Sequence, residues 1–129
     1  MNLIKKKYCF SWRIYQNLQV VKIIDKSFYE YGETVIPIGI RKFFEIEKYN
    51  RGDLINIDIV FKDRIYDSKI IFENNFNRSR LKLDRELKLQ IQELIQTSVC
   101  NGDYYNNKIS AIFIKDNSQK YNMALSVEI

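Results

Sequence analysis

The chain has 129 residues, enough for one domain with a single core, and 46% of them are hydrophobic. Its 21 Lys and Arg exceed its 16 Asp and Glu, so the net charge is +5, and 14% of the residues are aromatic. This composition excludes a disordered chain, and the absence of histidine excludes Ser-His and Cys-His nucleophile systems and an HNH-type nuclease.

The first half of the chain alternates short strands with loops. Residues 8–15 alternate weakly in polarity, which indicates an extra strand or an N-terminal extension. Short β-branched runs predict strands over 18–24 and 34–36, and the segment 25–32 between them predicts a loop. Pro37 suits the first position of a helix, and an apolar stripe predicts that helix after it: Ile38, Ile40, Phe43, Phe44 and Ile46.

A β-hairpin is predicted in the middle of the chain. Residues 54–61 alternate between apolar and polar types, a tight turn follows at Lys62-Asp63, and residues 64–72 form the return strand. A polar loop and a short strand that ends at Leu83 come next.

The last third of the chain predicts one helix and two strands. Asp84 is a helix N-cap, and one helix face is apolar: Leu87, Ile91, Leu94 and Ile95. Strands are predicted over 108–115 and 121–129. The complete order predicts an α+β fold, a seven-stranded open pseudobarrel with two short capping helices. The barrel domain would span residues 17–129, with 1–16 as an N-terminal extension or extra strand.

Cysteine usage and hydropathy indicate the compartment. Cys9 and Cys100 lack CxxC spacing, and we interpret them as reduced buried thiols. No apolar run reaches the roughly 18 residues of a membrane span, and no signal-peptide pattern is present. We therefore expect a cytoplasmic protein that does not bind membranes.

The sequence favours a binding module over an enzyme. It has no GxxxxGK[ST] loop for nucleotide hydrolysis. Carboxylate-x-lysine sequences occur at 45–48 and 86–88, but their charge spacing is typical of a solvated helix face. We expect no catalytic residue, metal or cofactor in this chain, so any nuclease or NTPase activity would lie in another domain.

The segment 74–83, Asn-Asn-Phe-Asn-Arg-Ser-Arg-Leu-Lys-Leu, concentrates side chains that can read DNA. Asn forms paired hydrogen bonds with adenine, and Arg forms them with guanine. The segment joins two predicted strands, so its loop would project from a sheet. A polar turn in a Lys- and Asn-rich chain is the alternative interpretation.

The element order and three short sequences carry a family resemblance. They are residues 34–44 (Thr-Val-Ile-Pro-Ile-Gly-Ile-Arg-Lys-Phe-Phe), Gly52-Asp53, and residues 77–81 (Asn-Arg-Ser-Arg-Leu). Together they resemble the B-three-type DNA-binding pseudobarrel, found in plant transcription factors and in the recognition domains of EcoRII, BfiI and LlaJI (McrB-like) restriction proteins. The resemblance covers residues 17–128, by element order more than by motif. Lys and Asn richness is typical of a low-GC bacterial genome and favours the restriction branch.

The resemblance implies a sequence- or modification-specific domain that grips double-stranded DNA with two arms in the major groove. One arm would lie within 22–31 and the other within 73–80. The implied base-reading residues are Lys26, Ser27, Asn74, Asn75, Asn77, Arg78 and Arg80. Candidate phosphate contacts are Lys5, Lys6, Lys7, Lys22, Arg41, Lys42 and Lys82. Arg80 has a second interpretation, in which it supports the loop through a carboxylate such as Asp84.

Three alternatives stay open. Residues 35–42 and Gly52-Asp53 also resemble the AbrB/MazE swapped-hairpin regulators, which are much shorter. An RNA-binding domain would stack bases on exposed aromatic residues, although a small barrel buries most of these in its core: Trp12, Tyr15, Phe28, Tyr29 and Tyr31. In a protein-interaction domain, the positive charge would be incidental.

Overall fold

The computed structural model describes residues 6–9, 11–15, 18–47, 50–73, 78–99 and 102–128. These residues form one nine-stranded sheet with the order β1-β2-β3-β8-β9-β5-β6-β7-β4. The strands are β1 (Lys6–Cys9), β2 (Trp12–Tyr15), β3 (Gln19–Ile23), β4 (Glu33–Ile36), β5 (Leu54–Phe61), β6 (Arg64–Phe72), β7 (Ser79–Lys82), β8 (Ile109–Asn117) and β9 (Lys120–Val127). All neighbouring strands are antiparallel except β5 and β9, which are parallel.

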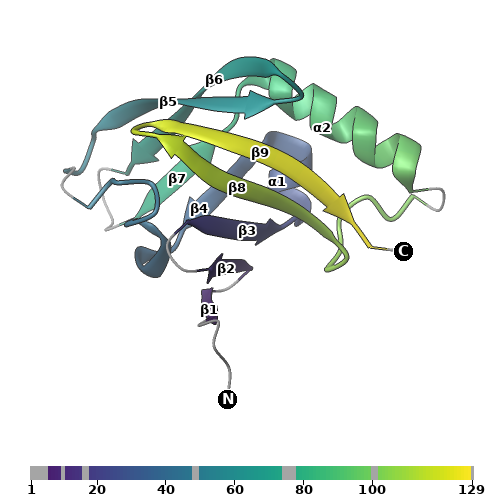
Figure 1. Cartoon of the computed structure of the whole chain (residues 1–129), viewed down its shortest axis with the longest axis horizontal. Helices are drawn as coiled ribbons and strands as arrows, with labels where there is room; N and C mark the ends of the chain where they lie inside the picture. Colours follow the sequence, from purple (N-terminus) through teal and green to yellow (C-terminus); the bar gives the residue numbers. More distant parts are fainter. Residues whose placement is uncertain are drawn as a thin grey trace.

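The sheet curls into a half-barrel around one hydrophobic core (Figure 1). Side chains alternate across each strand, so every second residue of β5 from Ile55, and of β6 from Tyr66, points inward and is buried. Ile57, Ile59, Ile70, Phe113 and Tyr121 are each at most 1% exposed. The α+β class expected from the sequence is confirmed.

Two helices pack at one end of the half-barrel (Figure 1): α1 (Lys26–Tyr31) and α2 (Arg85–Ser98). The Asp84 carboxylate caps α2 by accepting hydrogen bonds from the backbone N–H of Glu86 and Leu87. The inner face of α2 buries Leu87, Ile91 and Ile95. Among the described residues, no helix is long and apolar enough to cross a membrane.

The segment after Pro37 contributes a second set of core residues. It forms a short 3-10 helix, η1 (Ile38–Ile40), followed by turns through Glu45. Phe43 and Phe44 are 1% exposed, and their rings lie 5.3 and 5.1 Å from the ring of Tyr121 in β9.

A side chain of β2, the strand next to one margin of the curled sheet, reaches β4 at the other margin. The indole N–H of Trp12 in β2 donates a 3.0 Å hydrogen bond to the backbone carbonyl of Val35 in β4. Trp12 is 1% exposed and packs against Phe44 and Phe113. We call this junction of β2 and β4 the seam.

The structure corrects three expectations. The sheet has nine strands in place of seven, because residues 6–15 form the hairpin β1–β2. The segment 25–32 contains α1, which Asp25 caps and Gly32 (φ 67°) ends, so it is not a loop. The helix expected after Pro37 is reduced to η1 and turns, because its N–H groups, such as those of Ile40, Phe43 and Phe44, bond to carbonyls three residues back, and Glu45 then adopts a left-handed conformation (φ 57°).

The strand boundaries otherwise follow the predicted alternation closely. The hairpin turn at Lys62 and Asp63 is confirmed, with both residues in the left-handed region at φ 50° and 64°. The helix capped by Asp84 is also confirmed.

The seam generates a stability prediction. We expect Trp12→Phe to lower the free energy of unfolding by about 1–3 kcal/mol, because it leaves a cavity and removes the donor for the Val35 carbonyl. Urea unfolding followed by circular dichroism measures this loss. The exposed Leu89→Ala on α2 is the control and should change stability by less than about 0.5 kcal/mol. Equal losses in both variants would show that the seam contributes nothing special.

Candidate nucleic-acid interface

Three cationic side chains project from one face of the sheet at β7. Arg78, Arg80 and Lys82 alternate with the buried Ser79 and Leu81, so they point to the outer side. The side chains of Arg78 and Lys82 are 50% and 54% exposed, and that of Arg80 is 30% exposed. We call these three residues the cation row.

Two glutamates hold the cation row in place. Glu73 lies 3.6 Å from Arg78 and 3.0 Å from Arg80, measured from its Oε1 to each Nε. Glu33 of β4 lies 3.2 Å from Arg80 and 3.9 Å from Lys82. Three cations therefore share two carboxylates, which orders the guanidinium groups and leaves one positive charge in excess.

A backbone hydrogen bond between Glu73 and Arg78 closes the base of the expected second arm. The backbone N–H of Glu73 donates a 2.9 Å hydrogen bond to the carbonyl of Arg78, which brings the two ends of the 74–77 connection together. The expected base-reading residues Asn74, Asn75 and Asn77 lie outside the described residues. Arg78 and Arg80 therefore extend from the point where this connection joins the sheet.

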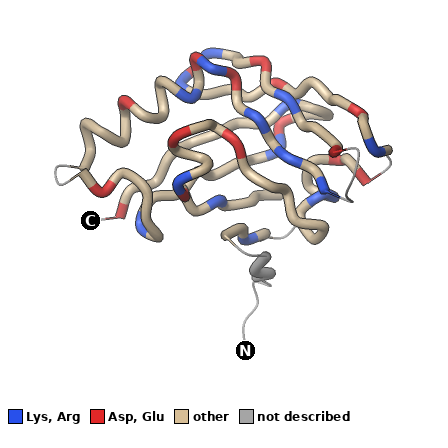
Figure 2. Tube along the Cα trace, turned by 180° about the vertical axis from the view of Figure 1, so that it is seen from behind, with Lys and Arg blue, Asp and Glu red and all other residues tan. Residues whose placement is uncertain are grey.

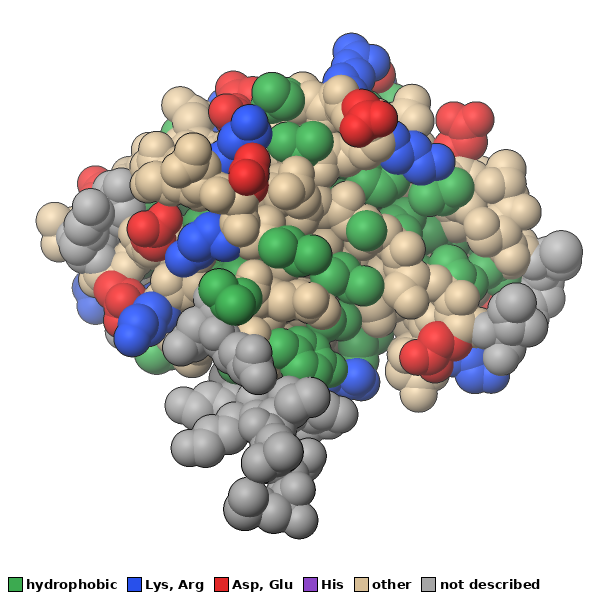
Figure 3. Space-filling model, viewed as in Figure 1, with side chains coloured by type: hydrophobic (Ala, Val, Ile, Leu, Met, Phe, Trp, Pro, Cys, Tyr) green, Lys and Arg blue, Asp and Glu red, His purple; other side chains and the backbone are tan. Residues whose placement is uncertain are grey.

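Charged residues lie along the strands at the back of the molecule. Figure 2, turned so that β7 and β4 lie in front, shows Lys and Arg positions along these strands, with Asp and Glu positions among them. The opposite side, over β8 and β9, shows hydrophobic groups across its middle (Figure 3). Ile112, Ile114 and Ala124 lie side by side there on neighbouring strands.

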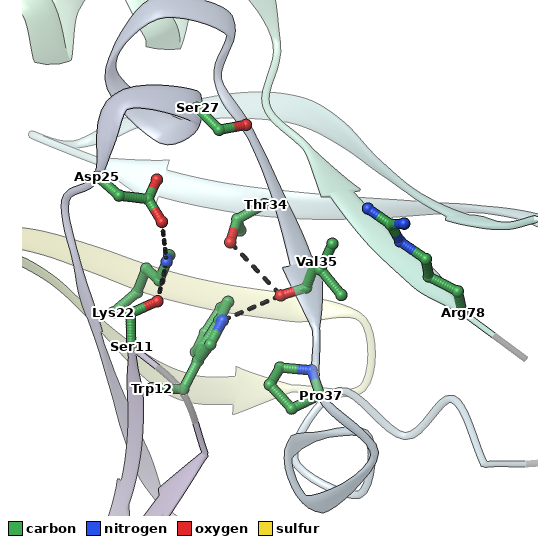
Figure 4. Close-up of a pocket in the computed structure, with 9 residues that line it drawn as sticks. All are labelled: Ser11, Trp12, Lys22, Asp25, Ser27, Thr34, Val35, Pro37 and Arg78. Carbon is green, nitrogen blue, oxygen red and sulfur yellow. Dashed lines mark hydrogen bonds and ion pairs between the residues drawn. The ribbon is translucent and has the colours of Figure 1, made fainter.

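A pocket of about 430 Å³ opens beside the seam (Figure 4). It lies between β2, β3 and α1 on one side and β4 on the other, with Arg78 at its edge. We call it the seam pocket. It is lined by Ser11, Trp12, Lys22, Asp25, Ser27, Thr34, Val35, Pro37 and Arg78.

Lys22 is a buried cation in this pocket. Its side chain is 1% exposed, and its Nζ donates hydrogen bonds to Ser11 Oγ and, at 2.7 Å, to Asp25 Oδ2. Burial lowers the pKa of the Lys22 ammonium from its usual 10.5, and the hydrogen bond and negative charge of Asp25 oppose that shift. The other oxygen of Asp25 accepts from the backbone N–H of Phe28, so one carboxylate both caps α1 and pairs with the lysine.

The expected first arm contains a helix where the sequence predicted a loop. Lys26 and Ser27 are exposed but belong to α1, and Ser27 Oγ donates a 2.9 Å hydrogen bond to the Glu33 carbonyl. The expectation that Lys22 contacts a phosphate is wrong, because its side chain is buried and paired with Asp25. The structure nevertheless brings Ser27 and Arg78, one from each expected arm, to the same pocket.

The remaining candidate phosphate contacts are dispersed. Lys42 is exposed, and Arg41 is partly buried with its guanidinium carbon 5.4 Å from the ring centre of Phe72. Lys6 and Lys7 lie in β1, where only the backbone is described, and Lys5 lies outside the described residues. Arg80 pairs with the carboxylates of Glu33 and Glu73, and these take the place of the suggested partner Asp84.

Sequence reasoning missed a charged cluster on the β5–β6 hairpin. Lys69 lies directly opposite Lys82, and Asp58 lies directly opposite Asp67, with all four side chains on the exposed face. Asp67-Ser68-Lys69 is a further carboxylate-x-lysine sequence, which the predicted hairpin register could have revealed. Among the described residues, no group of three His, Cys, Asp or Glu side chains could hold a metal ion.

Comparison with known proteins identifies a relative by fold. No protein-family model matches the sequence, and no curated protein matches it. The N-terminal domain of Helicobacter pylori LlaJI.R1 is similar in structure, with a TM-score of 0.57 and 15% sequence identity. The match covers 85% of this chain and 80% of that chain. The protein therefore has a LlaJI-like fold.

The buried lysine predicts a pH-dependent stability. Because its pKa is lowered in the folded state, the unfolded chain binds more protons between that lowered pKa and about 10.5. Raising the pH through this window should therefore stabilise the wild type relative to Lys22→Met. Chemical unfolding of both proteins at several alkaline pH values measures the difference. A difference that falls with rising pH would contradict the lowered pKa.

Proposed function

We propose that this chain is a sequence- or modification-specific double-stranded DNA-binding module of a bacterial restriction system. The observation that carries the proposal is the cation row, three ordered cations beside the base of the expected second arm. The LlaJI-like fold supports the same assignment, because the relative is a domain of a restriction protein. The module would act in the cytoplasm with a fused or associated nuclease or NTPase and would have no catalytic activity itself.

The geometry suggests a division of labour in DNA binding. Arg78 and Arg80 carry the planar forks that form paired hydrogen bonds with guanine, and their glutamate partners orient these forks. Lys82 and Lys69 carry point charges that suit backbone phosphates, which position a protein without specifying sequence. Specific DNA would exchange the Arg–Glu contacts for Arg–base contacts at the same side chains.

The alternatives receive less support from the described residues. Of the five aromatic residues named for the RNA-binding alternative, Trp12, Phe28 and Tyr29 are buried in the core and not open to stacking on bases, whereas Tyr31 is 62% exposed. Val35 and Ile36 end β4 of a single nine-stranded sheet, in contrast to the much shorter swapped-hairpin regulators. The cation row is ordered by ion pairs, which argues against incidental charge as in a protein-interaction domain.

The first test compares nucleic acids directly. We expect duplex DNA to bind more tightly than single-stranded DNA or RNA at fixed salt. Affinity for the duplex should fall steeply between about 50 and 200 mM salt, because Lys and Arg release counterions from the phosphates. Fluorescence anisotropy titrations at several salt concentrations measure both effects. Preferential binding of RNA, or duplex binding that ignores salt, would refute the proposal.

The second test separates base reading from phosphate contact. Arg78→Ala should cost roughly 1–3 kcal/mol for the preferred duplex and little for random DNA, because it removes a base-edge pair. Lys42→Ala should weaken binding to all sequences alike and lower the salt slope by about one unit. Affinities of both variants for a selected site and for random DNA measure the contrast.

Both side chains are exposed, so the two variants should fold normally, which circular dichroism checks. If Arg78→Ala weakens binding to both kinds of DNA equally, Arg78 is a phosphate contact and the direct-readout claim is wrong.

A further inference from the structure

Glu33 contacts two cations of the cation row from a neighbouring strand. Its Oε2 accepts a 3.2 Å hydrogen bond from Nη1 of Arg80, and its Oε1 lies 3.9 Å from Nζ of Lys82. Glu33 stands directly opposite Lys82 in the β4–β7 ladder, so strand pairing brings these two side chains together. The side chain of Glu33 is 26% exposed, and those of Arg80 and Lys82 are 30% and 54% exposed. The three groups therefore meet at the surface, where a ligand can reach them.

The Glu33 carboxylate also offsets a repulsion between two lysines. Lys69 of β6 stands directly opposite Lys82, and like charges at such positions are destabilising. Glu33 lies on the other side of Lys82, so the three residues form a line across β6, β7 and β4. Exposed ion pairs contribute little to stability, so this carboxylate matters more for what the cations can bind than for folding.

A DNA phosphate bound to these cations would lie close to the Glu33 carboxylate. Hydrogen bonds from a cationic nitrogen to an anionic oxygen are about 2.8 Å long. Glu33 lies 3.2 Å from Arg80 Nη1 and 3.9 Å from Lys82 Nζ, so a phosphate oxygen on either nitrogen would lie within about 7 Å of the carboxylate. This separation is shorter than the screening length of about 10 Å at 0.1 M salt, so the two negative charges would repel each other.

The edge of a base would not meet this repulsion. Bases are uncharged, and an arginine bonds to guanine O6 and N7 without bringing a negative charge to its carboxylate partner. A carboxylate can also accept a hydrogen bond from cytosine N4. Glu33 therefore penalises phosphate contacts with the cation row more than base contacts.

We propose that Glu33 is a specificity-determining residue that weakens nonspecific contacts between the cation row and the DNA backbone. Nonspecific binding depends on phosphate contacts, whereas a preferred site adds base contacts. A carboxylate that competes with phosphates for Arg80 and Lys82 therefore lowers the affinity for random DNA most. This role rests on the proposed function, whereas competition between Glu33 and an anionic polymer can be measured without DNA.

The first experiment measures the affinity of two glutamate variants for duplex DNA by fluorescence anisotropy. Glu33→Gln keeps the size of the side chain and removes its charge, and Glu93→Gln makes the same change at an exposed position of α2. At about 0.1 M salt, we expect Glu33→Gln to bind random duplex about three- to tenfold more tightly than Glu93→Gln, the effect of one unit charge at roughly 7 Å. Affinity for a selected site should rise less, so the ratio of selected-site to random affinity should fall.

The matched pair of variants separates a local effect from net charge. Both variants raise the net charge of the chain by one, and circular dichroism checks that both fold. Equal affinity of the two variants for random duplex would show that net charge alone matters and would overturn the inference. An equal gain of Glu33→Gln on selected and random duplexes would overturn its role in specificity.

The second experiment uses immobilised heparin, an anionic polymer without bases. Glu33→Gln should elute at higher salt than Glu93→Gln, because Arg80 and Lys82 no longer share their charge with a carboxylate of β4. In a Lys82→Gln background, the gain from Glu33→Gln should become smaller, since one of its two partners is absent. A gain of undiminished size would overturn the assignment of the effect to the cation row.

The two experiments distinguish failure of this inference from failure of the proposed function. Duplex binding without a gain specific to Glu33→Gln, on DNA and on heparin, would overturn the inference and leave the proposed function intact. A gain specific to Glu33→Gln on heparin without any duplex binding would support the competition and refute the proposed function.

Discussion

The hydrogen bond from Trp12 to the Val35 carbonyl is the contact on which the arrangement of the molecule depends. A nine-stranded open sheet has two margins, and unpaired strand edges are prone to non-native pairing. Trp12 connects β2, near one margin, to β4 at the other, while its ring packs against two phenylalanines of the core. One side chain therefore joins the sheet margins, completes the core and forms part of the seam pocket.

This closure also determines which polar groups become neighbours. Lys22 lies opposite Trp12 in the β2–β3 ladder and on the inner side of β3, so closing the sheet buries its ammonium. Asp25, two residues beyond β3, then serves both the lysine and the start of α1. Burial of this cation and capping of the helix are coupled through one carboxylate, and a short helix replaces the loop expected over 25–32.

On the outer face, the same sheet orders charges that a loop would leave free. Arg80 and Lys82 face Val35 and Glu33 across the β4–β7 ladder, and Arg78 meets Glu73 where the 74–77 connection joins the sheet. Surface ion pairs contribute little to stability, typically less than about 1 kcal/mol each. Their effect here is geometric, because they bring three cations and two carboxylates together on one face of the sheet.

The sequence by itself determined the features that depend on local patterns. Period-two alternation predicted β5 and β6, the Lys62-Asp63 turn predicted their hairpin, and the Asp84 cap predicted the start of α2, because each depends on residues close together in the chain. The same reasoning identified Arg78, Arg80 and Lys82 as one basic segment. It misjudged residues 37–46, where hydrogen bonds to carbonyls three residues back form a short 3-10 helix and turns in place of the expected α-helix.

Only the tertiary structure decided which distant residues share a site. Glu33 meets Arg80 across 47 positions of sequence, and Trp12 meets Val35 across 23, so no local pattern signals either contact. Lys22 illustrates most clearly what the sequence could not predict. Its place in the expected first arm suggested an exposed cation, whereas closure of the sheet buries it. Long-range strand pairing sets burial, and burial sets whether a charged side chain can meet a phosphate or only its internal partner.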